Sequence, residues 1–267
     1  MSDKRDELRR LIHQMESVAV AYSGGVDSTL LLKIAHNELG ERVIAITADS
    51  PSLPRHELQA AQAIAASIGA RHICLATNEL IDANYVANTP QRCYFCKSHV
   101  GDELMAYARA NGYRFVIDGN NADDVGDHRP GRRAAQERGI RSPLQEAGLT
   151  KAEIRTWARE LGLPNWDKPA AACLSSRIPY GTSVSVEALA QIERAEGFLR
   201  EQGFRQLRVR HHGPVARLEL DAVDFPRLLE LRHAVVTALR EMGFAYVALD
   251  LSGFRSGSMN EVLSNGR

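Results

Sequence analysis

The chain has 267 residues, of which 33 are lysine or arginine and 33 are aspartate or glutamate, so its formal net charge is zero. A neutral chain lacks the basic field that recruits nucleic acid, which disfavours a nucleic-acid partner. It contains no apolar run long enough to cross a bilayer, and residues 1–7 are too polar for a signal peptide. We therefore expect a cytoplasmic protein that has no membrane-bound part.

The first half of the chain alternates between apolar runs and segments with helical periodicity. The expected elements are a strand at 18–22, a helix at 27–37, a strand at 42–47, a helix at 54–67, a strand at 72–75, a helix at 97–111 and a strand at 115–118. This alternation predicts an α/β fold with a doubly wound parallel sheet, whose ligands bind at the carboxyl ends of the strands. A further helix is expected from Thr150, with Glu153 three residues later, to about Gly162.

The second half begins with a connection and continues as a smaller α+β domain. Residues 164–182 are rich in proline, glycine and serine and have little periodicity, which is typical of a linker. The elements expected after it are a helix at 186–202, strands at 206–211 and 215–220, a helix at 225–242 and a strand at 246–249. We therefore expect domains at 1–165 and 185–267, joined by residues 166–184.

The most informative motif is Ser23-Gly24-Gly25-Val26-Asp27-Ser28, between the first strand and the first helix. Its glycines let the backbone approach an anion, at which the first helical amides and the helix dipole also point. Ser23 and Ser28 add hydroxyl donors, whereas the Asp27 carboxylate would repel a phosphate unless a divalent cation lies between them. The motif differs from a Walker A loop and from a dinucleotide fingerprint. It predicts a site for magnesium and pyrophosphate.

Two other polar segments follow expected strands. Asp49 comes after the second strand, and residues 119–124, with Asn121 and Asp124, come after the fourth. The carboxyl ends of parallel strands meet at one edge of a sheet, so these segments should converge with residues 23–28 on one nucleotide-binding crevice.

Four cysteines in a cytosolic chain of this length do not indicate a disulfide framework. Cys74 lies in an apolar strand pattern and is expected to be a small buried residue. Cys93 and Cys96 have the spacing for one disulfide, one zinc ion or one corner of an iron–sulfur cluster. Cys173 lies in a loop with Arg177 nearby, a cation that would favour its thiolate. The spacing alone leaves these alternatives open.

Five motifs together resemble the ATP-dependent sacrificial sulfur transferases of the LarE family, a branch of the PP-loop ATP pyrophosphatases. In chain order they are Ser-Gly-Gly-Val-Asp-Ser at 23–28, Cys-Tyr-Phe-Cys-Lys at 93–97, Asp-Gly-Asn-Asn-Ala-Asp-Asp-Val-Gly-Asp-His-Arg-Pro-Gly at 118–131, Ala-Cys-Leu-Ser-Ser-Arg-Ile-Pro-Tyr-Gly at 172–181 and Gly-Phe-Arg-Ser-Gly-Ser-Met-Asn-Glu at 253–261. The resemblance covers nearly the whole chain and implies the adenine nucleotide alpha hydrolase-like fold. The first motif indicates only the superfamily, whereas the last two are far more selective.

The resemblance implies an enzyme of nickel-pincer nucleotide cofactor biosynthesis. Such an enzyme uses Mg-ATP to adenylate a carboxylate of pyridinium-3,5-dicarboxylate mononucleotide, releases pyrophosphate and converts the carboxylate to a thiocarboxylate. Asp27 matches the magnesium-binding residue, and Cys173 matches the cysteine that donates its sulfur. In the single-cysteine type, this leaves dehydroalanine on the protein. The resemblance also implies a homo-oligomer, a hexamer.

Further site residues come from the same resemblance. Those implied to bind the substrate are Lys97, Ser176, Arg177, Arg208 and Arg210. Glu196 and Glu219 resemble family residues near the substrate or a bound metal, although surface charges would also explain them. Without the resemblance, the two arginines at 208 and 210 would be read as a solvated strand face.

The extra thiols of Cys93 and Cys96 depart from the single-cysteine pattern. With Cys173 they resemble a three-cysteine arrangement in which the cysteines hold a [4Fe-4S] cluster, whose fourth iron stays open to carry a sulfide. Zinc binding and a purely sacrificial Cys173 are the alternatives. Other readings of the whole chain are a PP-loop ligase such as NAD synthetase or a tRNA thiolase, and a zinc-containing nucleotide-binding regulatory module.

Overall fold

The computed structural model describes residues 2–124, 130–169 and 171–255. They form two compact units, one from Met1–Glu79 and Gln91–Ala171 and the other from Leu80–Pro90 and Ala172–Arg267. The segment Leu80–Pro90 thus leaves the first unit and packs within the second, where the Asn88 side chain donates hydrogen bonds to the carbonyl oxygens of Ile178, Pro179 and Thr182. A sequence pattern does not reveal such an excursion, because long-range hydrogen bonds hold it.

The sheet of the first unit has four parallel strands. They are β1 (Val18–Ala21), β2 (Val43–Asp49), β3 (Arg71–Ala76) and β4 (Phe115–Ile117), in the spatial order β3-β2-β1-β4. The chain reverses its winding direction between β1 and β4, and ligands of such sheets bind in the crevice at that point. The predicted doubly wound parallel sheet is confirmed.

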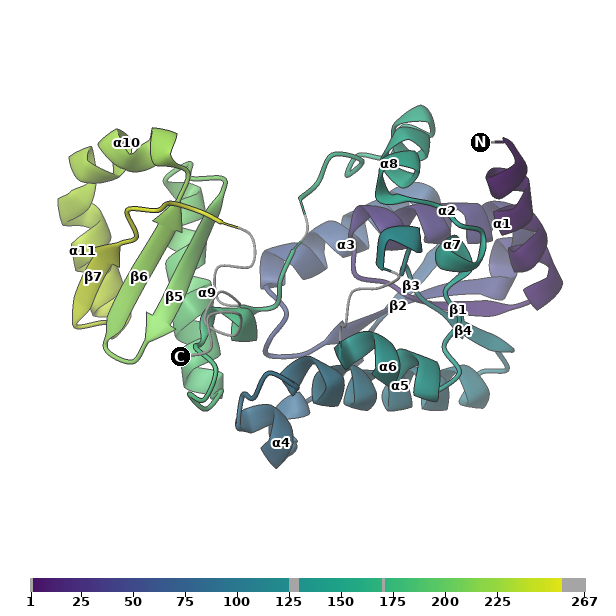
Figure 1. Cartoon of the computed structure of the whole chain (residues 1–267), viewed down its shortest axis with the longest axis horizontal. Coiled ribbons are helices and arrows are strands. Elements are labelled where there is room, and N and C mark those ends of the chain that lie inside the picture. Colours follow the sequence, from purple (N-terminus) through teal and green to yellow (C-terminus); the bar gives the residue numbers. More distant parts are fainter. Residues whose placement is uncertain (1, 125–129, 170, 256–267) are drawn as a thin grey trace. The chain divides into compact units, whose positions relative to one another are not determined.

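Helices cover both faces of this sheet (Figure 1). They are α1 (Ser2–Met15), α2 (Val26–Leu39), α3 (Arg55–Ile68), α5 (Arg92–Ala110), α6 (Pro130–Glu137), α7 (Pro143–Glu146) and α8 (Lys151–Glu160). Val18 and Val20 pack against α1, α2, α3 and α8, whereas Ala19 packs with Leu104 and Ala108 of α5 on the opposite face. Because successive strand residues point to opposite faces, a strand covered on both sides must be apolar throughout.

The prediction missed the short helices α6 and α7, and two longer helices of the first unit also differ from it. Helix α1 was not predicted, because its polar start hides an apolar stripe at Leu8, Ile12 and Met15, all fully buried. Helix α5 begins at Arg92 rather than at 97, so Cys93 and Cys96 lie inside the helix instead of before it. The buried Arg92 side chain belongs to this extra first turn, and a charged residue there is not a sequence signal for a helix start.

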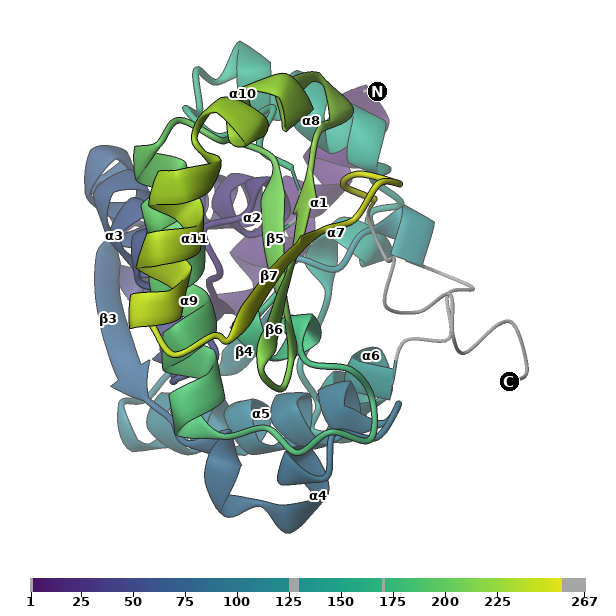
Figure 2. The same ribbon diagram turned by 90° about the vertical axis from the view of Figure 1, so that its left-hand side faces the viewer.

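The second unit is a three-stranded sheet with helices on one face. Its elements are α4 (Ala83–Val86), α9 (Val186–Glu201), β5 (Leu207–His212), β6 (Val215–Leu220), α10 (Phe225–Glu230), α11 (Arg232–Glu241) and β7 (Tyr246–Leu249). The strand order is β5-β6-β7, and Figure 2 shows α9 and α11 on the same face of the sheet. The predicted smaller α+β domain is confirmed.

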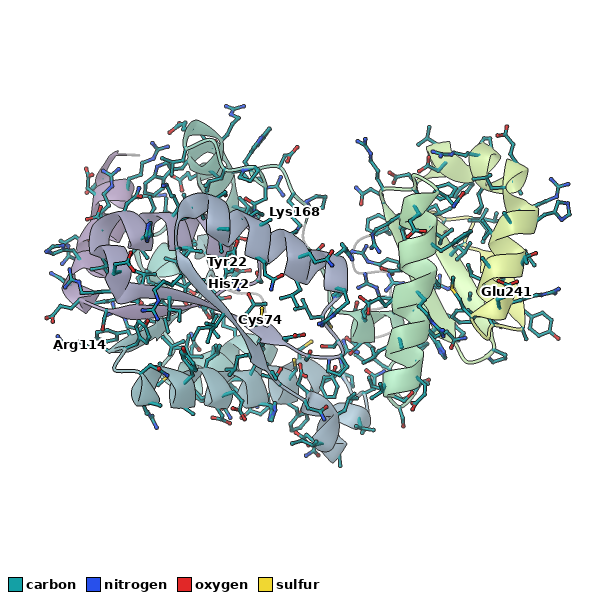
Figure 3. The ribbon with its side chains drawn as sticks, turned by 180° about the vertical axis from the view of Figure 1, so that it is seen from behind. Tyr22, His72, Cys74, Arg114, Lys168 and Glu241 are labelled. Atoms are coloured by element: carbon teal, nitrogen blue, oxygen red, sulfur yellow. The ribbon has the colours of Figure 1, made fainter. Side chains whose placement is uncertain are left out.

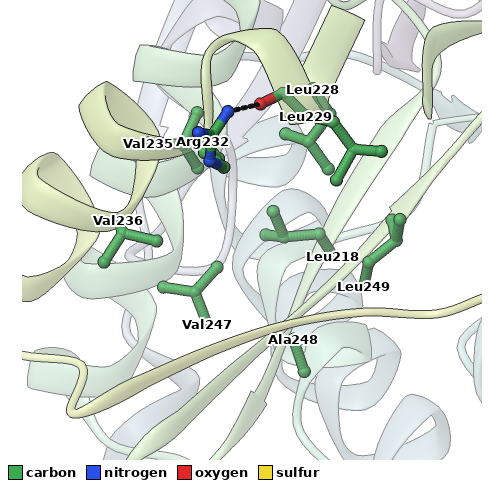
Figure 4. A pocket seen from close by; sticks show the side chains of 9 residues that line it. All are labelled: Leu218, Leu228, Leu229, Arg232, Val235, Val236, Val247, Ala248 and Leu249. Carbon is green, nitrogen blue, oxygen red and sulfur yellow. Dashed lines mark hydrogen bonds between the residues drawn. The ribbon is translucent and has the colours of Figure 1, made fainter. Parts of the chain in front are cut away.

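The helix predicted at 225–242 is two helices, because the backbone of Leu231 departs from helical geometry with φ −86° and ψ 5°. Each piece presents its own apolar residues to the core, Leu228 from α10 and Leu239 from α11. Between these helices and β6 and β7 lies an apolar pocket, in which Arg232 is the charged residue and donates a hydrogen bond to the Leu229 carbonyl oxygen (Figure 4). The pocket contains none of the predicted site residues.

In the part of the chain that the structure describes, no helix is long and apolar enough to span a membrane.

Candidate functional site

The loop between β1 and α2 is a preformed cradle of backbone amides. Gly24 has φ +69°, and a Cβ atom there would lie 2.8 Å from the Cβ of Ala61 in α3, so only glycine fits. The Ser23 hydroxyl accepts a hydrogen bond from the Gly25 amide at 3.3 Å, and the Ser28 hydroxyl donates to the Gly25 carbonyl oxygen at 3.1 Å. The loop is therefore ordered by its own residues and by α3.

The segment that follows β4 approaches this cradle closely. A Cβ atom on Gly119 would lie 2.9 Å from the Ser28 amide nitrogen, so the backbones of the two loops come into direct contact. Asn121 donates a hydrogen bond from its side chain to the Asp27 carboxylate at 3.3 Å, and its own amide donates to the Asp124 carboxylate at 3.0 Å. The structure thus brings residues 23–28 together with Asn121 and Asp124, as the sequence predicted.

Lys151, at the start of α8, is a site residue that the sequence analysis missed. Its ammonium group forms an ion pair with the Asp27 carboxylate, and its backbone amide donates to Asp123 at 2.8 Å. A lysine in the first turn of a helix opposes the helix dipole, so it carries an electrostatic cost. A lysine at this position was the one sequence signal that could have identified Lys151 as a site residue. The ion pair places a positive charge at the carboxylate that was predicted to hold magnesium.

Asp118 and Asp49 lie at the ends of two strands. Burial raises the pKa of Asp118, whose carboxylate accepts hydrogen bonds from Ser142 at 2.7 Å and from the Asn120 side chain at 2.7 Å. These contacts order the segment that carries Asn121. The Asp49 carboxylate forms an ion pair with Arg55 at 2.5 Å at the start of α3. Its nucleotide-binding role stays a prediction.

Cys93 and Cys96 lie one helical turn apart in α5, so their side chains leave the same side of the helix. Cys93 is exposed, and the Cys96 thiol donates a hydrogen bond to the buried Glu79 carboxylate at 3.4 Å. A Cβ atom on Gly131 in α6 would lie 2.9 Å from the Cγ of Lys97, so α6 packs tightly against this turn. Within residues 2–124, 130–169 and 171–255, no group of three or more potential ligands is arranged to hold a metal ion.

Cys74 is exposed rather than buried, so the prediction for it was wrong. Strand β3 is the edge of the sheet, and its residues are covered less than those of the central strands. Figure 3 labels Cys74 together with Tyr22 and His72, the latter two in edge-to-face contact with ring centroids 5.6 Å apart. Cys74 accepts a hydrogen bond from the Gln62 side chain at 3.3 Å.

In the second unit, Cys173 precedes the short 3₁₀ helix Leu174–Arg177. Arg177 is only 2% exposed, and its guanidinium donates to the carbonyl oxygens of Ala172 at 2.7 Å and Cys173 at 2.9 Å. The rest of that group forms a two-pronged ion pair with Glu196 of α9, at 2.9 and 3.1 Å. Arg177 therefore holds the backbone of Cys173 in place and so positions its thiol.

Glu196 is fully buried and also accepts hydrogen bonds from Arg200 at 3.0 Å and from the Val209 amide at 3.1 Å. Burial by itself raises the pKa of Glu196, but the charges and hydrogen bonds of Arg177 outweigh it, so the pKa lies below its ordinary value. Glu219, also fully buried, pairs with Arg210 at 2.7 Å and Arg217 at 3.1 Å. The two carboxylates are thus surrounded by guanidinium groups, and their predicted metal role stays a prediction.

Arg208 and Arg210 belong to this group of arginines and buried glutamates. Arg210 is buried and also donates to the carbonyl oxygen of Ser176 at 2.9 Å, in the 3₁₀ helix that follows Cys173. Arg208 is half-buried, with its guanidinium 5.1 Å from the Phe254 ring. Burial, followed by repulsion from Arg177, lowers the pKa of Arg208 to about 10. A guanidinium whose charge is destabilised by burial and by like charges is a favourable place for an anion to bind.

Comparison with known proteins agrees with this geometry. A family model described as asparagine synthase matches residues 5–173. The chain is 40% identical to the pyridinium-3,5-bisthiocarboxylic acid mononucleotide synthase of Lactiplantibacillus plantarum, over 100% of this chain and 97% of that protein. The chain belongs to the LarE family of PP-loop ATP pyrophosphatases. It is also 47% identical to an uncharacterized protein of Synechocystis, over 99% of both chains, and 31% identical to one of Methanocaldococcus jannaschii, over 90% and 92%.

Membership of the LarE family confirms the predicted resemblance and makes the chain an ATP-dependent enzyme that uses Mg²⁺. The roles of individual residues, the iron–sulfur type and the oligomeric state stay predictions. Cys93 and Cys96 belong to the first unit, whereas Cys173 belongs to the second. Residues 125–129 and 256–261 of two LarE motifs lie outside the described residues.

Proposed function

We propose that the chain adenylates a carboxylate of pyridinium-3,5-dicarboxylate mononucleotide and converts it to a thiocarboxylate in nickel-pincer nucleotide cofactor biosynthesis. The observation that carries this proposal is the cradle of residues 23–28, with Asp27 between Asn121 and Lys151, in a chain whose whole length matches a synthase of that product class. The substrate is a small nucleotide, and the enzyme acts in the cytoplasm as a homo-oligomer.

The first step activates a poor electrophile. A substrate carboxylate oxygen attacks the α-phosphorus of ATP, the bond to the β-phosphate oxygen breaks, and pyrophosphate leaves. Hydrogen bonds within the loop hold its shape, and its backbone amides with the hydroxyls of Ser23 and Ser28 would donate to the departing pyrophosphate. Mg²⁺ held by Asp27 would neutralise part of its charge. A metal ion at Asp27 would compete with the Lys151 ammonium for this carboxylate, and Lys151 could then contact a phosphate oxygen instead.

The second step moves sulfur. In the sacrificial route, the alternative to the cluster described below, the Cys173 thiolate would attack the acyl carbon and AMP would leave, which would join the sulfur to the substrate. Loss of the Cys173 Cα proton would then break the Cβ–S bond, so that the thiocarboxylate departs and dehydroalanine remains. Arg177 supports this step because it donates to the carbonyl oxygens of Ala172 and Cys173, which lie on the two sides of the Cys173 Cα atom. Arg208 and Arg210, with Ser176 and Lys97, bind the acidic groups of the substrate.

Cys93, Cys96 and Cys173 supply three thiols, the ligand type that iron–sulfur clusters require. We propose that they hold a [4Fe-4S] cluster, which would provide an open iron as a carrier of replaceable sulfide. Cys93 and Cys96, one turn apart on one side of α5, would hold two of its irons. A zinc ion on the same thiols and a purely sacrificial Cys173 are the alternatives.

The test is pyrophosphate release by anaerobically purified enzyme with Mg-ATP and the dicarboxylate mononucleotide. We expect release that depends on the mononucleotide, and a thiocarboxylate product detected by mass spectrometry. Release supported by ammonia or by tRNA instead would assign the chain to another type of PP-loop ligase. No release with any acceptor would favour a nucleotide-binding regulatory module. Iron and sulfide analysis of the same sample distinguishes the cluster from zinc.

A further inference from the structure

Asn165 lies after α8 and contacts the nucleotide cradle from outside. Its side chain is 5% exposed, and the side-chain amide donates hydrogen bonds to the Gly24 carbonyl oxygen and to the Thr29 hydroxyl, both at 2.9 Å. These partners lie on either side of the loop, one before α2 and one in its first turn. A single amide group therefore ties the entry of the loop to the helix that follows.

The contact with Gly24 fixes the direction of a neighbouring donor. A trans peptide unit is planar, so its carbonyl oxygen and the amide hydrogen of the next residue point in opposite directions. With the Gly24 oxygen held by Asn165, the Gly25 amide is directed to the other side, where the Ser23 hydroxyl accepts it at 3.3 Å. Gly24 has φ +69°, and glycine adopts several backbone conformations at similar free energy, so the residue itself does not fix this one. The hydrogen bond from Asn165 selects one of them.

The contact with Thr29 extends this support into the buried layer behind the loop. The Thr29 hydroxyl lies 3.4 Å from the Tyr22 hydroxyl at the end of β1, and the Thr29 amide donates to the Gly25 carbonyl oxygen at 2.9 Å. Thr29 is fully buried and Tyr22 is 2% exposed. Asn165 thus belongs to a buried polar group that holds the loop against the end of the sheet.

One feature of Asn165 argues against a role in stability alone. In the described part of the structure, its side-chain carbonyl oxygen is buried without a hydrogen-bond partner. An unsatisfied buried acceptor costs about 1–3 kcal/mol, which an apolar side chain of the same shape would avoid. The side chain carries that cost, and its two donated hydrogen bonds go to Gly24 in the cradle and to Thr29 in the first turn of α2.

We propose that Asn165 is a positioning residue for pyrophosphate, which holds the Gly24–Gly25 peptide with its amide on the Ser23 side of the loop, where the amide can exchange its 3.3 Å hydrogen bond to the Ser23 hydroxyl for one to a phosphate oxygen. The proposal rests on the proposed function, because it requires that residues 23–28 bind ATP. The expected signature is a loss of affinity confined to ligands that carry a pyrophosphate group. AMP lacks that group and should bind equally well with or without Asn165.

The experiment measures binding by calorimetry with three probes, Mg-ATP, Mg-pyrophosphate and AMP. Asn165→Leu keeps the shape of the side chain and removes its donors. Thr29→Val keeps the Gly24 contact and removes the second one, together with the Tyr22 contact of the same hydroxyl. Asn88→Leu is the matched control, because the buried Asn88 amide likewise donates to three carbonyl oxygens, but in the second unit. All binding is measured well below the unfolding temperature of each variant.

We expect Asn165→Leu to weaken Mg-pyrophosphate and Mg-ATP binding by about tenfold or more, because a misdirected amide loses one charge-assisted hydrogen bond. AMP affinity should change by less than about twofold, within the range of a weak indirect effect. Thr29→Val should show a smaller loss with the same selectivity, and Asn88→Leu should leave the affinity for all three probes unchanged.

Unchanged pyrophosphate affinity in folded Asn165→Leu would overturn the inference, and so would an equal loss for AMP. If Asn165→Leu does not fold, Thr29→Val decides by the same comparison. A wild-type protein that binds neither Mg-ATP nor Mg-pyrophosphate would refute the proposed function itself, and this inference with it.

Discussion

Replacing Glu196 with glutamine is expected to destabilise the second unit by about 3–5 kcal/mol, the usual cost of removing one partner from a buried ion pair. The estimate applies here because Glu196 is fully buried, Arg177 is 2% exposed and two hydrogen bonds join them. Glutamine has the same shape but no charge, and its amide hydrogens would face the Arg177 guanidinium. The Arg177 charge then stays buried without its counter-charge.

The assay is denaturant unfolding followed separately for the two units. Since they are distinct compact units, we expect only the transition of the second to shift. Glu201→Gln is the matched control, because Glu201 lies on the same helix but is exposed, and surface substitutions usually change stability by less than about 0.5 kcal/mol. Equal stability of Glu196→Gln and wild type would refute the reasoning and leave the Glu196 carboxylate available for a metal ion.

The same carboxylate predicts a pH dependence. Its pKa lies below the ordinary value of 4.5, so the ionised form stabilises the folded state. This stabilisation is complete above the unfolded pKa and is lost as the pH falls through the lower folded pKa. The stability difference between wild type and Glu196→Gln should therefore shrink as the pH is lowered below about 4.5. A difference that grows on acidification would contradict the sign of this shift.

Predictions for four further variants concern the reaction. Asp27→Asn should abolish pyrophosphate release, and Lys151→Met should slow it by about tenfold to a hundredfold, as expected for a lost charge-assisted contact; wild-type rates in steady-state assays would remove either residue from the mechanism. Arg208→Ala should raise the substrate KM by about tenfold or more with unchanged ATP affinity, and a collapse of ATP binding in the folded variant would contradict its assignment. Cys93→Ala should lose the iron–sulfur absorbance and sulfur transfer but keep adenylation; full activity with dehydroalanine at Cys173, detected by intact-protein mass spectrometry, would end the cluster hypothesis.

The sheet could be predicted because its strands carry a local signal. Val18, Ala19 and Val20 are apolar on both faces, and no other arrangement of so short a run explains that pattern as well as a covered parallel strand. Helix ends were harder to predict. The start of α5 contains Arg92, Cys93 and Cys96, which have no apolar period, and tertiary packing against α6 stabilises it. The N-cap of α8 was predictable because Thr150 and Glu153 satisfy each other locally.

The residues of the candidate site likewise divide into those that the sequence could predict and those that it could not. Residues 23–28 are contiguous, so their motif contains most of the loop geometry. Lys151 and Asn165 reach the loop from more than a hundred residues away, and no period or spacing connects them to it. The sequence does contain a cost at Lys151, a cation at the positive end of a helix, whereas Asn165 lies in a segment that reads as a linker and gives no such signal. Such a cost indicates a tertiary partner without identifying it.

Arg177 illustrates why closeness along the chain does not predict an electrostatic role. Four residues from Cys173, it was expected to favour the thiolate by direct attraction. In the structure its guanidinium binds Glu196 and two carbonyl oxygens, so much of its charge is neutralised and its donors are directed at the backbone. The contribution to sulfur transfer that we propose for it is therefore geometric. In the proposed function, positive charge for an anionic substrate comes instead from Arg208, whose own pKa is depressed by burial and by its cationic neighbours. An anion that binds at Arg208 relieves that repulsion, so substrate binding and the stability of this group of buried arginines and glutamates should reinforce each other.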